Sequence, residues 1–190
     1  MSIDDAKTAL HRLTVDEKMM PDLDSADLNA VIRNVYEPAG MKLFSPVLHE
    51  AESADYGACR FRLDGHNIVF RVAKTTPTKI GQFVTLWKRR RPGDAIEPLD
   101  AGDPVDFVVV CTSNAAHHGQ FIFTRKILIE KGVISSPDTV GKRAIRVYPP
   151  WSNPVAIEAV RTQKWQLRYF LDFSEGGAAD PTHVRGFFTG

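Results

Sequence analysis

Cysteine is scarce in this chain, whose 190 residues include two, Cys59 and Cys111. Two cysteines cannot form a four-thiolate metal site, and they fit a reducing compartment better than a disulfide-rich secreted fold. Long apolar runs are also absent: the longest, such as residues 107–111, reach about five residues, far below the ~20 of a transmembrane helix. The N-terminus is acidic where a secretory signal peptide would be basic, so we expect a cytoplasmic protein that is not embedded in a membrane.

Short motifs of the common enzyme classes are missing as well. The sequence has no glycine-rich phosphate loop, no Gly-x-Ser-x-Gly nucleophile elbow and no His-Glu-x-x-His zinc motif. Its histidines are scattered, apart from the adjacent His117 and His118, which are more simply explained as exposed loop residues than as metal ligands. We therefore predict no cofactor.

Charge is nearly balanced over the whole chain but is unevenly distributed along it. The formal net charge is +1. Residues 1–55 contain eleven Asp/Glu against five Lys/Arg, whereas residues 56–170 contain eighteen Lys/Arg against nine Asp/Glu. A basic middle region can attract phosphates even when the total charge is close to zero.

Hydrophobic periodicity predicts one mixed α/β domain with a central sheet flanked by helices. Helical spacing occurs at residues 4–18 and 25–35, and Asp64-Gly65 predicts a hairpin turn between strands at 56–63 and 67–72. Later strands are expected at 80–87, 105–111, 120–124 and 144–148, and later helices at 125–131 and 154–171. The predicted parts of residues 1–190 are a helical segment (1–40), the core (41–172) and a loose tail (173–190).

Residues 71–91 form the most unusual passage, because they contain seven Lys/Arg and no Asp/Glu. Cations interleaved with Phe83, Trp87 and Gln82 are typical of a surface that binds phosphates by charge and unpaired bases by stacking. The alternative is a solvated basic edge strand with Trp87 in the core. Further cations lie near aromatic residues downstream, although each tryptophan taken singly is better predicted as core: Arg146, Arg161, Lys164 and Arg168 near Tyr148, Trp151 and Trp165.

The chain contains several distinctive sequence motifs: Thr76-Pro77-Thr78-Lys79, Gly81-Gln82-Phe83-Val84, Gly119-Gln120-Phe121, Gly141-Lys142-Arg143-Ala144 and Arg146-Val147-Tyr148-Pro149-Pro150-Trp151. With them, roughly residues 30–172 resemble the MepB-like proteins, a bacterial family named after a gene in a multidrug-efflux operon. The resemblance implies a fold similar to type II restriction endonucleases, the PD-(D/E)xK superfamily. It also implies nucleic-acid binding rather than an established reaction.

The basic residues and the resemblance together predict a protein that binds DNA or RNA. Its affinity should be largely electrostatic and should fall steeply with salt. The residues predicted to contact nucleic acid are Arg71, Lys74, Lys79, Gln82, Lys88, Arg89, Arg90, Gln120, Lys142, Arg143, Arg146 and Trp151.

A PD-(D/E)xK nuclease site would need two carboxylates to hold Mg²⁺ and a lysine to activate water. Lys74 is the candidate lysine, but Val72 stands where the motif has an acid, and valine cannot ligate a metal. Binding without robust catalysis is therefore favoured. One alternative is a Mg²⁺-dependent nuclease that uses a migrated carboxylate, and the other is a regulatory module whose basic face meets an acidic partner or the chain's own acidic first 55 residues. The candidate carboxylates are Glu50, Glu52, Asp55 and Asp64 upstream and Asp106 downstream, with Glu52, Asp55 and Asp106 as candidate metal ligands.

Overall fold

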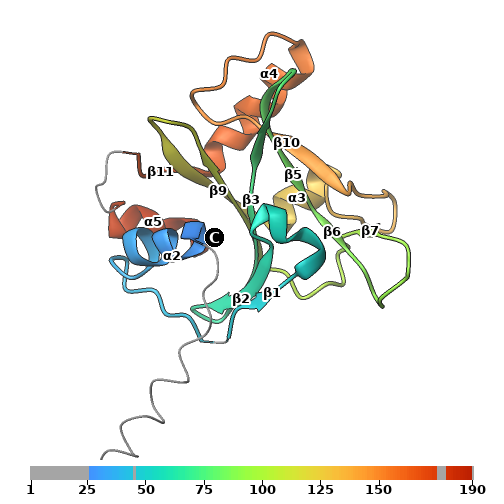
Figure 1. The fold of residues 1–190 in the computed structure, drawn as a ribbon, viewed down its shortest axis with the longest axis horizontal. Helices are drawn as coiled ribbons and strands as arrows, with labels where there is room; N and C mark the ends of the chain where they lie inside the picture. The colour runs from blue at the N-terminus through green and yellow to red at the C-terminus, as the bar shows by residue number, and fades with distance from the viewer. Residues whose placement is uncertain (1–25, 45, 175–178, 190) are drawn as a thin grey trace, which may run out of the picture.

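A six-stranded sheet forms the centre of the molecule in the computed structural model, which describes residues 26–44, 46–174 and 179–189 (Figure 1). Its strands, in spatial order, are β1 (Leu48–His49), β2 (Cys59–Leu63), β3 (His66–Val72), β8 (Phe107–Ser113), β9 (His118–Thr124) and β11 (Phe170–Asp172). The β3–β8 pair is parallel and the other pairs are antiparallel.

Smaller sheets and helices surround this central sheet. A three-stranded sheet has the order β10 (Ala144–Val147), β5 (Lys79–Thr85) and β4 (Lys74–Thr76), and a two-stranded sheet joins β6 (Trp87–Lys88) to β7 (Glu97–Pro98). The helices are α2 (Ala26–Val31), which continues as the π-helical turn η2 (Ile32–Tyr36), then η3 (Ala51–Tyr56), α3 (Arg125–Glu130), α4 (Ile157–Gln166), η4 (Leu167–Tyr169) and α5 (Pro181–Phe188). The predicted mixed sheet flanked by helices is confirmed.

The β2–β3 hairpin turns at Asp64 and Gly65, as the sequence predicts. Both residues have positive φ angles, 46° and 86°, which a two-residue turn of this hand requires. Leu63 and His66 are paired directly across the turn. The Asp64 side chain also accepts a hydrogen bond from the backbone N–H of Lys42 at 2.8 Å, so this carboxylate is used to fix the turn.

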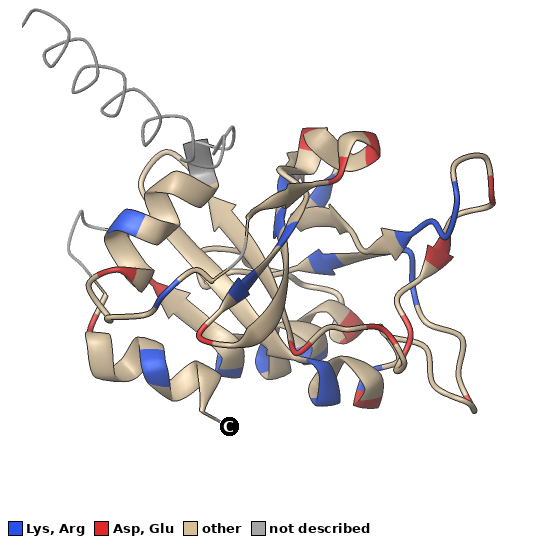
Figure 2. Cartoon of the chain, turned by 90° about the horizontal axis from the view of Figure 1, so that it is seen from below, with Lys and Arg blue, Asp and Glu red and all other residues tan. Residues whose placement is uncertain are grey.

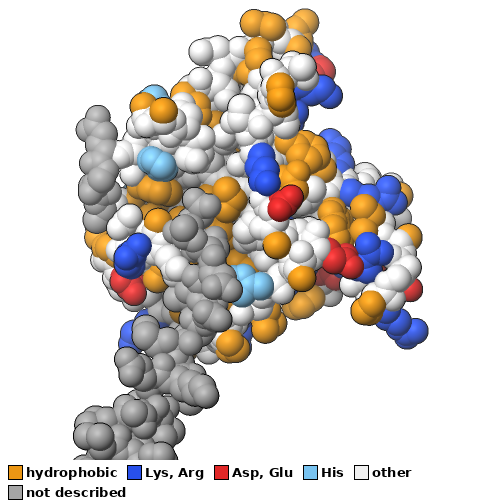
Figure 3. Space-filling model, in the orientation of Figure 1, with side chains coloured by type: hydrophobic (Ala, Val, Ile, Leu, Met, Phe, Trp, Pro, Cys, Tyr) orange, Lys and Arg blue, Asp and Glu red, His pale blue; other side chains and the backbone are white. Residues whose placement is uncertain are grey.

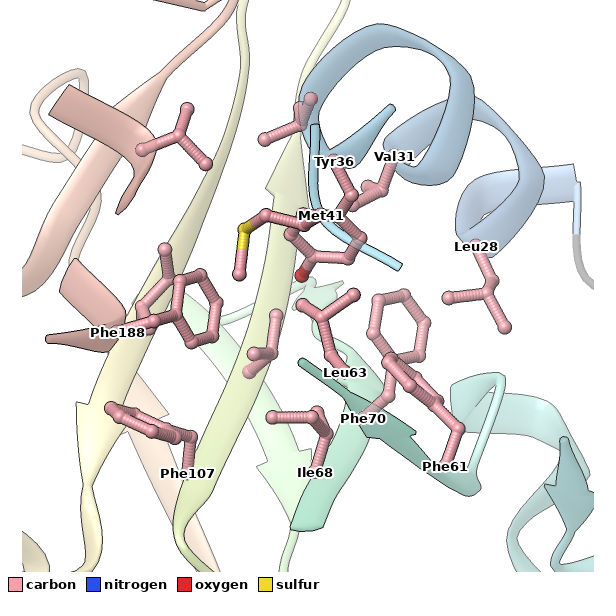
Figure 4. Close-up of a cluster of buried hydrophobic side chains, with 14 of the residues drawn as sticks. Leu28, Val31, Tyr36, Met41, Phe61, Leu63, Ile68, Phe70, Phe107 and Phe188 are labelled. Carbon is pink, nitrogen blue, oxygen red and sulfur yellow. The ribbon is translucent and has the colours of Figure 1, made fainter. Parts of the chain in front are cut away.

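Both faces of the central sheet are buried. On one face, Phe70 and Phe107 pack against Tyr36 from η2 and Phe188 from α5 (Figure 4). On the other face, side chains of β8 and β9 pack against the three-stranded sheet and α3: Val108, Val110, Phe121 and Phe123 meet Val84, Val147 and Leu128. Burial on both sides explains why β8 is a continuous apolar run rather than an alternating one.

The last predicted helix, at 154–171, is too long. Helix α4 ends at Gln166, whose side-chain amide donates to the Arg146 carbonyl at 2.9 Å and accepts from the Tyr148 N–H at 2.9 Å. After the short turn η4, residues 170–172 form β11 and pair with β9. Leu171 is buried there in the central core, where a continued helix could not place it.

The prediction of a loose tail after residue 173 is wrong for α5. Asp180 caps this helix by accepting hydrogen bonds from the N–H groups of Thr182 at 2.7 Å and His183 at 3.1 Å. The hydrogen bonds from His183 and Thr182 lower the pKa of the Asp180 carboxyl below its ordinary value. Val184 and Phe188 are buried.

The helix predicted at 4–18 lies outside the described residues. Within the described part of the chain, no helix is long and apolar enough to cross a membrane.

Candidate nucleic-acid interface

The basic run at residues 71–91 meets acids from other parts of the chain. Lys88 contacts the carboxylates of Asp100 and Asp103, the latter at 2.5 Å, and lies 3.9 Å from Glu97. Desolvation lowers the pKa of Lys88, but its hydrogen bonds to Asp100 and Asp103 outweigh that effect and raise it. Lys88 is therefore a structural cation whose charge is already compensated.

Two of the arginines that follow Lys88 are paired as well. Arg89 donates through Nε to Glu52 at 2.8 Å, and Arg90 donates through Nε to Glu97 at 2.6 Å. Figure 2 shows Lys and Arg beside Asp and Glu in this part of the molecule. The predicted strip of positive charge along residues 71–91 is thus largely neutralised by long-range ion pairs.

Arg71 was predicted to contact nucleic acid, but it is completely buried, with 0% of its surface exposed. Its guanidinium donates to the Phe70 carbonyl at 2.8 Å and to the Glu50 carboxylate. Glu50 also accepts from Arg60 at 2.6 Å, so one carboxylate serves two guanidiniums. Burial lowers the pKa of Arg71, and the neighbouring Glu50 opposes this shift. The assignment of Arg71 to the surface is therefore corrected.

Gln82 and Gln120 need the same correction, because they expose 5% and 0% of their surfaces. The Gln82 amide donates to Thr75 Oγ1 at 3.0 Å and to the Ser113 carbonyl at 2.8 Å, which ties the three-stranded sheet to the end of β8. Gln120 accepts a hydrogen bond from the Tyr36 hydroxyl at 3.2 Å. Both glutamines act inside the fold.

Arg146 fastens the turn between β4 and β5. Its Nη2 donates to Thr76 Oγ1 at 2.7 Å and its Nη1 donates to the Gly81 carbonyl at 3.1 Å. Gly81 has a φ of +81°, and a Cβ there would lie 2.7 Å from the Tyr148 ring. Lys79, which begins β5, is exposed. These contacts give Arg146 a structural role at the edge of the basic region.

The candidate nuclease residues are only partly brought together. The Lys74 ammonium lies 4.0 Å from Asp55, and both side chains are exposed. Glu52 is engaged by Arg89, and Asp106 accepts from the backbone and side chain of Asn67 at 2.8 and 3.0 Å. Among the described residues, no three His, Cys, Asp or Glu side chains gather as metal ligands. The two cysteines are buried, and burial raises the pKa of the Cys59 thiol to about 12.

A groove along α4 gathers cations from separate segments of the chain. Two adjoining hollows of about 310 and 390 Å³ share Lys131, Thr162 and Trp165. Glu158 is the one acid among the described residues that line them, and it pairs with Arg161 at 2.7 Å. Figure 3 shows Lys and Arg beside apolar side chains at the α4 end of the molecule. The cations that line this α4 groove are Lys131, Lys142, Arg146, Arg161, Lys164 and Arg168.

Trp165 belongs both to the core and to the α4 groove. Its ring packs against Phe123 and Tyr169 at centroid distances of 5.4 and 6.4 Å, and the Lys131 ammonium lies 5.8 Å from its centroid. A half-buried tryptophan of this kind is fixed by the core and still presents part of its surface to the groove.

The predicted contact residues overlap with the α4 groove only in part. Lys142 and Arg146 line it, whereas Arg143 donates to the Ile96 carbonyl at 3.0 Å. Trp151 stacks on His117 with ring centroids 5.2 Å apart. The predicted contact residues do not include four other cations of the groove, Lys131, Arg161, Lys164 and Arg168. The spacing of Arg161, Lys164 and Arg168 along α4 and η4 is a usable signal for three of them, whereas Lys131 follows α3.

Comparison with known proteins connects this architecture to a family. A model of the MepB-like family matches residues 50–172. The chain belongs to the MepB-like family. Among solved structures, a crystal structure of MepB is similar at a TM-score of 0.65 and 34% sequence identity, over 71% of this chain and 88% of that chain. No match was found among curated proteins.

Several residues of the MepB-like sequence blocks make contacts that hold the fold together. Arg146 joins one block to another through Thr76 and Gly81. A Cβ at Gly119 would overlap the Phe170 ring and lie 2.9 Å from the Leu171 carbonyl, so the β9–β11 pairing requires glycine there. The residues that carry the resemblance therefore hold the sheets together as well as bordering the α4 groove.

Proposed function

We propose that this MepB-like protein binds nucleic acid through the α4 groove, mainly by contacts to phosphates. The observation that supports the proposal is the balance of charge on the groove walls, where six cations face one acid. Neutralising several phosphates releases counterions from the nucleic acid, and this release drives binding. The ion-paired run at residues 71–91 offers no such excess.

Three cations of the α4 groove are also available to a ligand. Within the described residues, Lys142, Lys164 and Arg168 make no side-chain hydrogen bond or ion pair. Their charges can therefore meet phosphates without first breaking contacts inside the protein. Lys88 would have to leave two carboxylates, and Arg89 and Arg90 each already have a carboxylate beside them that offsets their charge.

The positions of the candidate carboxylates favour binding of nucleic acid without hydrolysis. Metal-assisted hydrolysis needs oxygen ligands beside the lysine. Asp55 is the one candidate carboxylate that pairs with Lys74 among the described residues, whereas Glu52 is paired with Arg89 and Asp106 accepts from Asn67. Val72 stands in the acid position of the restriction-endonuclease-like motif. Incubation of DNA and RNA with Mg²⁺ or Mn²⁺ should leave both intact, and cleavage that disappears in Lys74→Ala would support the nuclease alternative instead.

The decisive experiment removes three cations of the α4 groove together. In the triple variant Lys131→Ala/Lys164→Ala/Arg168→Ala, the slope of log K against log salt should become less negative by about 2 to 3, since each phosphate contact contributes about 0.7 to 0.9. Affinity at 50 mM salt should fall by at least about tenfold. Fluorescence anisotropy with labelled single- and double-stranded oligonucleotides measures both quantities.

A control variant removes the same number of charges elsewhere. Arg33, Lys42 and Lys126 are exposed and do not line the α4 groove. The variant Arg33→Ala/Lys42→Ala/Lys126→Ala should keep most of the affinity. Equal losses in the two variants, or salt-independent binding by the unmodified protein, would contradict the proposal.

A further inference from the structure

A second pocket, separate from the α4 groove, lies between η3 and the segment that follows β6. Its volume is about 450 Å³, which is within the range of small-molecule sites. Its lining includes Trp87 and three consecutive arginines, Arg89, Arg90 and Arg91, together with Glu52. The sequence arranges the arginines here because β6 ends at Lys88 and the chain then leaves the two-stranded sheet.

Among the described residues, Arg89 and Arg90 donate hydrogen bonds only through Nε, and the Arg91 side chain donates none. Glu52 and Glu97 each accept one hydrogen bond, from Nε of Arg89 and of Arg90. Within the described residues, Nη1 and Nη2 of these two guanidiniums make no hydrogen bond. The Arg91 side chain is exposed and has no hydrogen bond or ion pair in the same part of the chain. Three neighbouring residues therefore keep open donors at one pocket.

This mode of pairing prepares the guanidiniums for an anion. A guanidinium has five N–H donors in a fixed plane, and its paired donors match two oxygens of a phosphate. A carboxylate on Nε restrains the side chain while leaving Nη1 and Nη2 open, which reduces the conformational entropy lost on binding. Glu52 and Glu97 thus act as positioning residues for Arg89 and Arg90.

Trp87 adds a flat apolar surface to the same pocket. The guanidinium carbon of Arg89 lies 5.7 Å from the centroid of its ring. Trp87 is half-buried at the start of β6, where it pairs with Pro98 in β7. A ligand that carries a planar ring next to a phosphate could therefore contact Trp87 and the arginines together.

The charge around the pocket favours a small anion over a polymer. Its lining contains five cations, Arg60, Lys88, Arg89, Arg90 and Arg91, and three acids, Glu50, Glu52 and Asp103. Because this excess of two charges is smaller than the excess of five in the α4 groove, long-range attraction contributes less here. Recognition must depend on the geometry of the open Nη donors.

We propose that this pocket binds a nucleoside monophosphate, in which a sugar joins a phosphate monoester to a planar base. The guanidiniums of residues 89–91 hold the phosphate, and the ring lies against Trp87. The same chemistry occurs in a free nucleotide and at the 5′-phosphorylated end of a nucleic-acid strand. The proposal does not rest on binding at the α4 groove.

Titration calorimetry of the full chain with adenosine 5′-monophosphate tests this site. Arg91→Ala is the first variant, because the Arg91 side chain is exposed and makes no hydrogen bond or ion pair within the described residues, so its loss should leave the fold intact. Its affinity should fall by about tenfold or more, as expected for the loss of hydrogen bonds to a charged group. Arg33→Ala changes an exposed arginine that lines neither this pocket nor the α4 groove, so it is the matched control and should bind the nucleotide as the unmodified protein does.

Three comparisons decide the outcome. Adenosine should not bind measurably and inorganic phosphate should bind more weakly than the nucleotide, because each lacks one of the two recognised parts. The proposal is overturned if adenosine or inorganic phosphate binds as tightly as the nucleotide. It is overturned as well if no nucleotide binding is measured at millimolar concentration, or if Arg91→Ala binds the nucleotide with unchanged affinity. The Lys131→Ala/Lys164→Ala/Arg168→Ala variant should retain nucleotide binding, which separates this site from the α4 groove.

Oligonucleotides distinguish the two sources of the phosphate. If a 5′-phosphate tightens binding of a short strand to the unmodified protein but not to Arg91→Ala, the ligand is a strand end. If nucleotide binding occurs and the 5′-phosphate has no effect, the ligand is the free nucleotide. Either result supports the phosphate site.

Discussion

Replacing Arg71 by alanine is expected to lower the free energy of unfolding by about 3–5 kcal/mol. The side chain is fully buried between the central sheet and its neighbours, and it donates to the Phe70 carbonyl and to Glu50. Truncation leaves a cavity and removes one of the two guanidiniums from the Glu50 carboxylate, and both effects destabilise the fold. Urea unfolding followed by circular dichroism measures the change.

Two further variants separate the volume of Arg71 from its charge. The double variant Glu50→Gln/Arg71→Met fills the space and removes the Arg71–Glu50 charge pair, while the amide oxygen can still accept from the partly exposed Arg60. It should therefore cost less than about 2 kcal/mol. Arg161→Ala removes an exposed, ion-paired arginine on α4 and should cost less than about 1 kcal/mol. If Arg71→Ala is as stable as Arg161→Ala, the structural role of Arg71 is wrong.

Local patterns in the sequence predict much of the fold. The Asp64-Gly65 turn identifies the β2–β3 hairpin because that turn needs two positive φ angles, which Gly and Asp tolerate. The apolar run at residues 107–111 identifies a central strand, since a strand covered on both faces needs no alternation. Each signal depends on residues within a few positions of one another.

Local signals of this kind do not predict that the cations of residues 71–91 form ion pairs. The acids that neutralise them are 12 residues away for Lys88 and Asp100, and 37 residues away for Arg89 and Glu52. A count of charges within residues 71–91 contains none of these partners. The pairing depends on how η3 and the β6–β7 sheet come together in three dimensions, which periodicity does not specify.

Arg71 illustrates how a strand position can reverse an interpretation. It alternates with Phe70, so the two side chains point to opposite faces of β3. In a half-exposed strand Arg71 would face water, but β3 lies between β2 and β8 and the sheet is covered on both faces. The second cover, formed by the three-stranded sheet, comes from distant residues and is not apparent in the sequence of β3 itself.

The prediction of a loose tail is wrong although residues 180–188 contain a local signal for a helix. Glycines at 176 and 177 suggested a loose tail, but Asp180-Pro181 combines an N-cap with the residue preferred in the first turn of a helix. Val184 and Phe188 then follow at the spacing of one helical face. The burial of that face against η2 and β8 is what makes a helix of eight residues stable.

Replacing Phe188 by alanine should therefore destabilise the whole domain, by about 3–5 kcal/mol, as large-to-small changes of buried aromatic residues do. The Phe188 ring lies 5.0 Å from that of Phe107 and 6.0 Å from that of Tyr36, so α5 closes one face of the central core. Thr189→Ala changes an exposed neighbour and should be nearly neutral. Urea unfolding of both variants provides the test, because a tail that only rests on the surface would leave the midpoint of Phe188→Ala equal to that of Thr189→Ala.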